Sequence, residues 1–182
     1  GIFGVFYSDS TEVTADLLNR ACQILNHRGP DDRGHWIHPT KKMGLAHTRL
    51  SILDLDSRAR QPFESASKRS MLVFNGEIYN YQKLRLSLNC PLVTTSDTEV
   101  LIEHMEKNQL AGLHDLDGMF AFGFVNEKQI LLAVDPVGKK PLYTFWDGQT
   151  FAFSSEIKAF RAVPSISLDI EKAHLAEFVV SG

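Results

Sequence analysis

Cysteine is scarce in this chain, with only two among its 182 residues. Two cysteines are too few for the disulfide framework of a small secreted domain, and Cys22 and Cys90 lie too far apart in the sequence for a metal-binding knuckle. Cys22 falls in an apolar helical pattern and Cys90 directly precedes Pro91, so we expect both to be buried structural thiols. This usage favours a reducing compartment, and we expect a cytoplasmic protein.

The chain also lacks long hydrophobic runs and long runs of one charge. Its apolar stretches fall far short of the roughly 20 residues that span a bilayer, and no signal peptide is recognisable. The net charge is −3 and no basic segment occurs, so neither nucleic acid nor a membrane is an expected partner. His35 and His38 have the spacing of some metal pairs, but on a strand they would point to opposite faces, so no metal site is expected.

The residues that are present suffice for one globular domain, since 43% are apolar and 23% charged. The first segment, Ile2–Tyr7, is apolar and rich in β-forming residues. We expect it to lie in the middle of a sheet and to hold the N-terminal end inside the protein. The chain opens with Gly1 and not with Met, and it stops directly after an apolar helical pattern, so we expect that both ends continue in a longer protein.

Hydrophobic periodicity and turn residues place the remaining elements. We expect, in chain order, a helix that begins near Thr14 and ends before Gly29, a strand over 43–50, a strand leading into Phe74, a helix over 81–88, a helix that begins at Ser96 with a capping box to Glu99, a hairpin of strands over 118–125 and 129–135, strands over 142–146 and 150–154, a short helix from 154 and a last helix over 169–180.

The stretch Phe74–Asn80 carries the strongest chemical signal. We expect a buried strand to break here into a turn that presents the side-chain amide of Asn75, the backbone N–H of Gly76 and the carboxylate of Glu77, which are the parts of an oxyanion site. The alternative is an ordinary hairpin turn. The helical spacing of the apolar positions over 81–88 favours a strand-turn-helix junction instead.

Two charged residues suggest a bound amino acid. Arg49 has apolar neighbours, and a buried arginine needs an anion, which is either a structural ion-pair partner or a substrate carboxylate. Asp97 follows Ser96 at an expected helix start, where negative charge is favourable in any case, but there it could also face a pocket and bind an ammonium group. Together, Arg49 and Asp97 would suit a zwitterion.

Two loops leave their roles open. His27–Gly34 is rich in turn formers and charges, and it is either a solvated turn or an ordered loop in which Arg28 and Asp31 fix a neighbouring site. Lys139 and Lys140 are expected to be solvated, because a phosphate-binding loop would need a different glycine spacing.

These motifs, taken in order, resemble the N-terminal glutaminase domain of the asparagine synthetase (glutamine-hydrolysing) family, a class II glutamine amidotransferase. The resemblance covers essentially the whole chain and rests on Gly1-Ile2-Phe3-Gly4, His27-Arg28-Gly29-Pro30-Asp31, Ala46-His47-Thr48-Arg49-Leu50-Ser51-Ile52, Phe74-Asn75-Gly76-Glu77-Ile78-Tyr79-Asn80, Ser96-Asp97-Thr98-Glu99, Asp117-Gly118-Met119-Phe120-Ala121-Phe122, Lys140-Pro141-Leu142-Tyr143 and Phe153-Ser154-Ser155-Glu156-Ile157-Lys158-Ala159. It implies an α+β fold of the N-terminal-nucleophile (Ntn) hydrolase type, a four-layer αββα sandwich of two mostly antiparallel sheets. It also implies an amidotransferase domain over 1–163 and a linker with a first helix over 164–182.

The same resemblance implies glutamine hydrolysis by an N-terminal cysteine, whose thiol attacks the side-chain amide while its own α-amino group shuttles the proton. Asn75 and Gly76 would hold the oxyanion. Arg49 would bind the α-carboxylate of glutamine, and Glu77 and Asp97 would position its α-ammonium group. The glutamine-binding set that the resemblance implies also includes Leu50 and Ile52.

The resemblance further implies that ammonia passes to a C-terminal, ATP-dependent synthetase domain that amidates aspartate. ATP and Mg²⁺ are expected in that domain, and no cofactor or metal in this one. A homodimer is an expectation that the resemblance leaves open.

Two departures from the family pattern keep alternatives open. The pattern begins Cys-Gly-Ile, whereas this chain begins at Gly1, so the nucleophile is expected directly before Gly1. Family members usually carry Arg where this chain has Val134, which puts coupling to a partner domain in question. The alternatives are an inactive scaffold domain without the cysteine, a hydrolase of another amide, and an amidotransferase with an acceptor other than aspartate.

Overall fold

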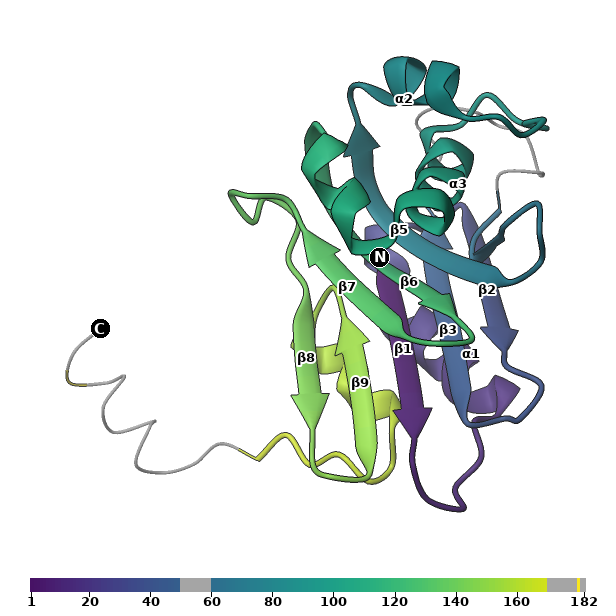
Figure 1. The fold of residues 1–182 in the computed structure, drawn as a ribbon. Coiled ribbons are helices and arrows are strands. Elements are labelled where there is room, and N and C mark those ends of the chain that lie inside the picture. Colours follow the sequence, from purple (N-terminus) through teal and green to yellow (C-terminus); the bar gives the residue numbers. More distant parts are fainter. Residues whose placement is uncertain (50–59, 170–179, 181–182) are drawn as a thin grey trace.

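A computed structural model describes residues 1–49, 60–169 and 180 and shows two sheets stacked between helices (Figure 1). One sheet has five strands in the order β2-β3-β1-β9-β8, and the other has four in the order β4-β5-β6-β7. The strand pairs of both sheets are antiparallel. The predicted α+β class with two antiparallel sheets is confirmed.

The elements follow the predicted order closely. The strands are β1 (Ile2–Tyr7), β2 (Asp32–Ile37), β3 (Met43–Arg49), β4 (Phe63–Glu64), β5 (Ser70–Ile78), β6 (Gly118–Asn126), β7 (Ile130–Val134), β8 (Tyr143–Trp146) and β9 (Thr150–Ser154). The α-helices are α1 (Ala15–Ile24), α2 (Tyr81–Ser87) and α3 (Asp97–Asn108), and the 3-10 helices are η1 (Asn26–Arg28), η3 (Gln109–Asp115) and η4 (Ile157–Ala162). The helix predicted over 169–180 lies almost wholly outside the described residues.

Three apolar clusters separate the layers. Leu18 of α1 and Phe160 of η4 pack on the outer face of the five-stranded sheet, whereas Leu101 of α3 packs with Phe122 on the outer face of the four-stranded sheet. The third cluster, which includes Phe153, fills the space between the sheets. Each such fully buried side chain contributes about 1.5–3 kcal/mol, so these clusters stabilise the predicted αββα stack.

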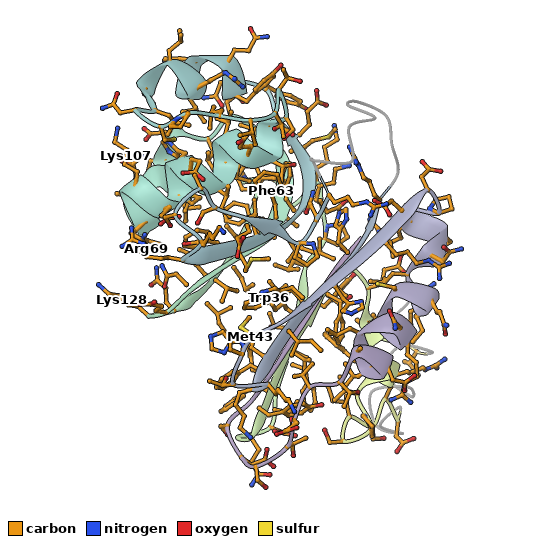
Figure 2. The ribbon with its side chains drawn as sticks, turned by 90° about the vertical axis from the view of Figure 1, so that its right-hand side faces the viewer. Trp36, Met43, Phe63, Arg69, Lys107 and Lys128 are labelled. Carbon is orange, nitrogen blue, oxygen red and sulfur yellow. The ribbon has the colours of Figure 1, made fainter. Side chains whose placement is uncertain are left out.

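Figure 2 shows the stack from the side. Met43, at the start of β3, belongs to the cluster between the sheets, and Trp36 of β2 packs against the same cluster. Phe63 of β4 belongs instead to the cluster beneath α2 and α3. Successive side chains of a strand point to opposite faces of its sheet, so the position of a residue along the strand decides which apolar cluster it joins.

The start of β1 is held inside the protein, as its apolar sequence predicted. β1 lies between β3 and β9 in the centre of its sheet, and Gly1 is buried. The Gly1 nitrogen donates to the Thr48 carbonyl at 2.7 Å, and the Thr48 N–H donates to the Gly1 carbonyl at 2.9 Å. On the other side, the Ile2 N–H donates to Ser155 Oγ at 3.0 Å. The start of β1 is thus held by β3 at Gly1 and by the residue after β9 at Ile2.

The prediction of a turn at Asn75-Gly76 is wrong. β5 continues through both residues to Ile78, in unbroken register with β6. The chain leaves the sheet only at Tyr79, and α2 follows, so the predicted change from strand to helix occurs, but three residues later. The physical reason is the long β6 strand, whose pairing keeps β5 extended beyond the Asn-Gly pair despite the turn propensity of those residues.

The helix predicted from Ser96 is confirmed as α3, with Ser96 Oγ accepting the Glu99 N–H at 3.3 Å. The second half of the predicted capping box is absent. The Glu99 carboxylate accepts the N–H groups of Val93 and Thr94, at 2.8 and 2.6 Å, and so ties down the loop before α3. The Ser96 N–H donates to Thr94 Oγ1 at 3.2 Å.

The two cysteines differ in their surroundings. Cys22 of α1 is buried, as predicted, whereas Cys90 is only partly buried. The Cys90 Sγ lies 3.7 Å from Glu103 Oε2. The prediction of a buried thiol is therefore wrong for Cys90, because the irregular segment between α2 and α3 covers it incompletely.

Candidate active site

A cavity of about 340 Å³ lies where the start of β1, the ends of β3 and β5 and the start of α3 meet. This volume is within the usual range for small-molecule sites. The cavity is lined by Gly1, Arg28, His47, Thr48, Arg49, Gln61, Phe74, Asn75, Gly76, Glu77, Ser96, Asp97, Thr98, Met119 and Lys140. Five of the predicted site residues, Arg49, Asn75, Gly76, Glu77 and Asp97, thus face one space, whereas Leu50 and Ile52 lie outside the described residues.

Along the outer edge of β5, side chains accept the backbone hydrogen bonds that a neighbouring strand would otherwise accept. The Phe74 N–H donates to Gln61 Oε1 at 2.6 Å, and the Ile78 N–H donates to Asp97 Oδ2 at 3.0 Å. Gly76 lies midway between them, and its N–H points to the same edge because backbone direction alternates along a strand. Two of three successive edge donors are therefore satisfied by residues that also line the cavity.

The pairing of β6 leaves the third donor unused. Gly76 lies opposite Phe120, and the Phe120 backbone bonds to Asp135 on its other side: its N–H donates to Asp135 Oδ2 at 3.1 Å and its carbonyl accepts the Asp135 N–H at 2.8 Å. Gly76 and Phe120 are therefore a non-hydrogen-bonded pair of the antiparallel ladder, in which the backbone N–H and carbonyl groups of both residues point away from the partner strand. The Gly76 N–H consequently has no acceptor among residues 1–49 and 60–169.

Position 76 admits no side chain. Gly76 has φ +158°, and a Cβ atom built on it would lie 2.1 Å from the Met119 carbonyl oxygen and 2.7 Å from Phe120 Cα. Glycine is thus required by the close approach of β6. Its absence of a side chain also leaves the N–H open toward the cavity.

Two side-chain donors at the cavity are buried and unpaired. Within the part of the chain that the structure describes, the buried side-chain nitrogens without a hydrogen-bond partner are Asn75 Nδ2 and Arg28 Nε. Both residues line the cavity. An unpaired buried donor costs about 1–3 kcal/mol, so a pair of them in one cavity indicates that a ligand with acceptor atoms binds there.

The charges around the cavity are mixed. Arg28, Arg49 and Lys140 are cationic, whereas Glu77 and Asp97 are anionic. Burial raises the pKa of Asp97, and the nearby Glu77 carboxylate raises it further, against the opposing hydrogen bond from Ile78. An ammonium group beside these two acids would relieve that cost, because an opposite charge favours the ionised carboxylate.

His47 and the Gly1 nitrogen occupy a dry part of the site. His47 of β3 is buried, and burial lowers its pKa to about 3, with a further contribution from the positive charge at Gly1. Burial likewise lowers the pKa of the Gly1 amino group to about 5, and the Arg28 guanidinium adds to this. The region therefore disfavours extra positive charge, and His47 is neutral at physiological pH.

The segment His27–Gly34 was predicted as a loop, but it begins in η1 and its last three residues belong to β2. It is ordered, as one of its two interpretations required. A Cβ on Gly29 would lie 2.5 Å from the Thr48 carbonyl oxygen, so the loop packs directly on the end of β3. Arg28 Nη1 donates to Glu156 Oε1 at 2.9 Å, and the Asp31 N–H donates to the Arg49 carbonyl at 3.1 Å. The loop thereby joins the ends of β3 and β9 beside the cavity.

Among the lining residues that sequence reasoning did not assign to the site are Gln61, His47 and Lys140. Lys139 is exposed, but Lys140 is partly buried, so the prediction of a solvated side chain is wrong for Lys140. The Asp135 carboxylate accepts the N–H groups of Lys139 and Lys140 at 3.0 and 3.2 Å, which curls the loop toward the site. His47 and Lys140 belong to the quoted motifs and could have been found there, whereas Gln61 has no local pattern that marks it.

A second cavity, of about 480 Å³, lies at the opposite end of β5 and contains no predicted site residue. Among the described residues, no cluster of three or more His, Cys, Asp or Glu side chains could hold a metal ion. Of the helices in the described ranges, none has both the length and the hydrophobicity to span a bilayer.

Sequence comparisons give the following matches. The family described as the glutamine amidotransferase domain matches residues 1–182. Asparagine synthetase (glutamine-hydrolyzing) 2 of Bacillus subtilis (strain 168) is 36% identical over 167 residues, which are 90% of this chain and 22% of the relative. Asparagine synthetase B (glutamine-hydrolyzing) of Escherichia coli (strain K12) is 38% identical over 166 residues, which are 87% of this chain and 29% of the relative. The chain spans only 22% to 34% of the length of these and similar curated relatives.

Solved structures share the fold. Glutamine phosphoribosylpyrophosphate amidotransferase from B. subtilis, complexed with ADP and GMP, superposes with a TM-score of 0.74 at 23% identity, over 90% of this chain and 43% of that chain. A structure described as the allosteric regulatory enzyme of purine biosynthesis gives a TM-score of 0.75, at the same identity and the same coverage.

Proposed function

Because this chain belongs to the glutamine amidotransferase domain family, we propose that its cavity hydrolyses glutamine to glutamate and ammonia with a cysteine that directly precedes Gly1. The fold is the predicted Ntn-hydrolase sandwich, which the solved amidotransferases share. In the proposed reaction the thiol sulfur bonds to the side-chain carbonyl carbon of glutamine, and the thiol proton passes through the cysteine's α-amino group to the departing ammonia. Water then cleaves the thioester to give glutamate.

The observation that carries this proposal is the pair of unused donors at Asn75 and Gly76. Asn75 Nδ2 is buried without a partner, and the Gly76 N–H has no acceptor among the described residues. Two preorganised donors of this kind, beside a carbonyl under attack, stabilise the negative oxygen of the tetrahedral intermediate. The predicted oxyanion role thus rests on strand geometry and not on a turn.

Alternation along β1 supports a nucleophile before Gly1. Ile2 points into the layer between the sheets, and side chains two residues apart share one face. The side chain of a residue before Gly1 would therefore point from β1 toward the four-stranded sheet, which contains Asn75.

The charged residues of the cavity match the α-carboxylate and α-ammonium groups of a free amino acid. In this proposal Arg49 binds the α-carboxylate with its guanidinium fork, and Glu77 and Asp97 bind the α-ammonium group. Leu50 and Ile52 complete the proposed binding set. A blocked amide lacks one of the two charges, which is why the proposal favours free glutamine over a peptide.

The proposal extends to a C-terminal synthetase domain. The matched region is only 22% to 34% of the length of the curated relatives. Their names describe glutamine-hydrolysing asparagine synthetases. We assign to that domain the use of ATP and Mg²⁺, and aspartate as the acceptor of the ammonia, and we assign no cofactor to the domain described here. The domain boundary stays at the predicted residue 163.

The test uses the full-length native protein. Intact mass of its N-terminal peptide should show one cysteinyl residue before Gly1, and glutamate should form from glutamine but far more slowly from N-acetylglutamine. With ATP, Mg²⁺ and aspartate, asparagine should form. A native chain that begins at Gly1, or equal turnover of the blocked amide, would overturn the assignment, and formation of a different amide would correct only the acceptor.

A further inference from the structure

The end of β9 is bound closely to the start of β1. Ser154 Oγ donates to the Ile2 carbonyl at 3.1 Å, and Ser155 exchanges two bonds with Ile2, one through its Oγ and one through its N–H, each of 3.0 Å. Glu156 follows directly. The segment therefore brings a carboxylate close to the start of β1, whose first residue, Gly1, lines the cavity.

Glu156 contacts three basic side chains. Its Oε1 lies 2.8 Å from His27 Nε2 and 2.9 Å from Arg28 Nη1, and its Oε2 lies 3.1 Å from Lys158 Nζ. Although burial alone would raise the pKa of Glu156, the hydrogen bonds from Arg28, His27 and Lys158 lower it to about 2. The carboxylate is thus ionised at physiological pH and binds Arg28 by a charge-assisted bond.

Arg28 is the only one of these three that lines the cavity among the described residues. A Cβ atom on Gly1 would lie 3.1 Å from Arg28 Cδ, so the arginine packs against the first residue. Its side chain is 25% exposed, and its Nε is buried without a partner. One end of the guanidinium is fixed by Glu156, and a free donor remains at the other end.

We propose that Glu156 is a positioning residue that fixes the Arg28 guanidinium beside the residue preceding Gly1, where Arg28 stabilises the thiolate form of the nucleophile. This inference rests on the function proposed above. Glu156 acts only through Arg28 and touches no reacting atom. Without the carboxylate, the flexible arginine side chain turns toward solvent, since holding it in one rotamer costs conformational entropy that the ion pair no longer offsets.

The direction in which the thiol pKa changes shows whether Glu156 acts by positioning Arg28 or only through its own negative charge. Removal of the Glu156 charge alone would make the surroundings more positive and would lower the thiol pKa. Loss of Arg28 from its place would raise the thiol pKa, and Arg28 influences the Gly1 nitrogen more strongly than Glu156 does. The other charged or titratable groups that line this space are His47, Arg49, Glu77, Asp97 and Lys140, and all of them stay unchanged in the variant.

The test compares Glu156→Gln with two matched variants in the full-length protein. The first control, Glu12→Gln, removes an exposed ion-pair partner of Lys41 (3.2 Å) in the segment between β1 and α1, beyond the end of β1 that is far from Gly1. The second control, Lys158→Gln, removes another ion-pair partner of Glu156 but leaves Arg28 in place. The measurement is the pH dependence of alkylation of the N-terminal thiol by iodoacetamide, together with kcat and KM for glutamine. We expect Glu156→Gln alone to raise the thiol pKa and to lower kcat about tenfold, with KM changed less than twofold.

A double variant shows whether the effect passes through Arg28. In an Arg28→Gln background, Glu156→Gln should cause no further rise of the thiol pKa, because coupled residues are not additive. A lowered or unchanged thiol pKa in Glu156→Gln, or an additive effect in the double variant, would overturn the inference while leaving glutamine hydrolysis by the parent protein intact. Absence of an alkylatable thiol at the N-terminus of the parent protein would instead refute the proposed function itself.

Discussion

The Asp97 carboxylate at the start of α3 accepts the Ile78 N–H at the end of β5, with 3.0 Å between the nitrogen and Oδ2. This bond fixes the helix start against the strand that carries Asn75 and Gly76. The same carboxylate lines the cavity. Asp97 is therefore an acid at a helix start whose carboxylate also faces the cavity, and its second role, the binding of a substrate ammonium group, stays a prediction.

Asp97→Asn should separate these roles. The amide oxygen can still accept the Ile78 N–H, but the negative charge that we assign to the substrate ammonium is lost. We expect KM for glutamine to rise about 10- to 100-fold, as befits one charge-assisted bond, while thermal unfolding changes little. Asp16→Asn, which alters an exposed acid in the first turn of α1, is the matched control. An unchanged KM would exclude Asp97 from substrate binding.

Asn75→Ala should lower kcat without destabilising the fold. The Asn75 Nδ2 atom has no partner among the described residues, so its removal forfeits no bond in the free protein. Loss of one oxyanion donor typically reduces kcat about 100- to 1,000-fold. Steady-state kinetics check the fall in kcat, and urea unfolding of the same preparation checks that stability is unchanged. A large loss of stability would show that Asn75 has a structural role instead.

Gly76→Ala should be strongly destabilising, because the new methyl group meets the Met119 carbonyl at 2.1 Å and φ is +158°. We expect a cost of about 3 kcal/mol in the free energy of unfolding. Gly138 provides the control, since it has φ +65° and nothing lies within 4 Å of its built Cβ. Gly138→Ala should cost only the backbone penalty of about 1 kcal/mol. Equal costs at the two positions would contradict the close approach of β6.

Stability should fall as the pH decreases below the ordinary pKa of histidine. His47 has a pKa of about 3 in the folded protein, against 6.5 when unperturbed. Between these values the unfolded chain binds a proton that the folded chain does not, so protons favour unfolding. We expect His47→Gln to flatten the loss of stability between pH 6.5 and 5, measured by urea unfolding at each pH. The matched control is His35→Gln, which changes an exposed histidine outside the cavity.

Much of the fold could be read from local sequence. The apolar run Ile2–Tyr7 became the central strand, and Ser96 became the N-cap of α3. Such features depend on neighbouring residues alone, through alternation, helical spacing and capping. The quoted motifs also indicated the family and five of the residues that line the cavity.

The donor geometry could not be predicted in this way. Asn75-Gly76 has turn propensity, yet β5 runs through it because β6, some 40 residues later, pairs with it throughout. The Gly76 N–H faces the cavity because Phe120 is already bonded to Asp135 on the other side of β6. Gln61 reaches Phe74 from another segment again.

The sequence by itself therefore determined most of the strands and helices, although not β4, η3 or the end of β5, and it determined which residue types are available for chemistry. Only the tertiary structure decided that the ends of β3 and β5, the starts of β1 and α3, and Arg28, which is paired with Glu156, meet at one cavity. The physical reason is that propensity and capping act over a few residues, whereas backbone donors and charges find their partners through sheet pairing between segments that are distant in the chain.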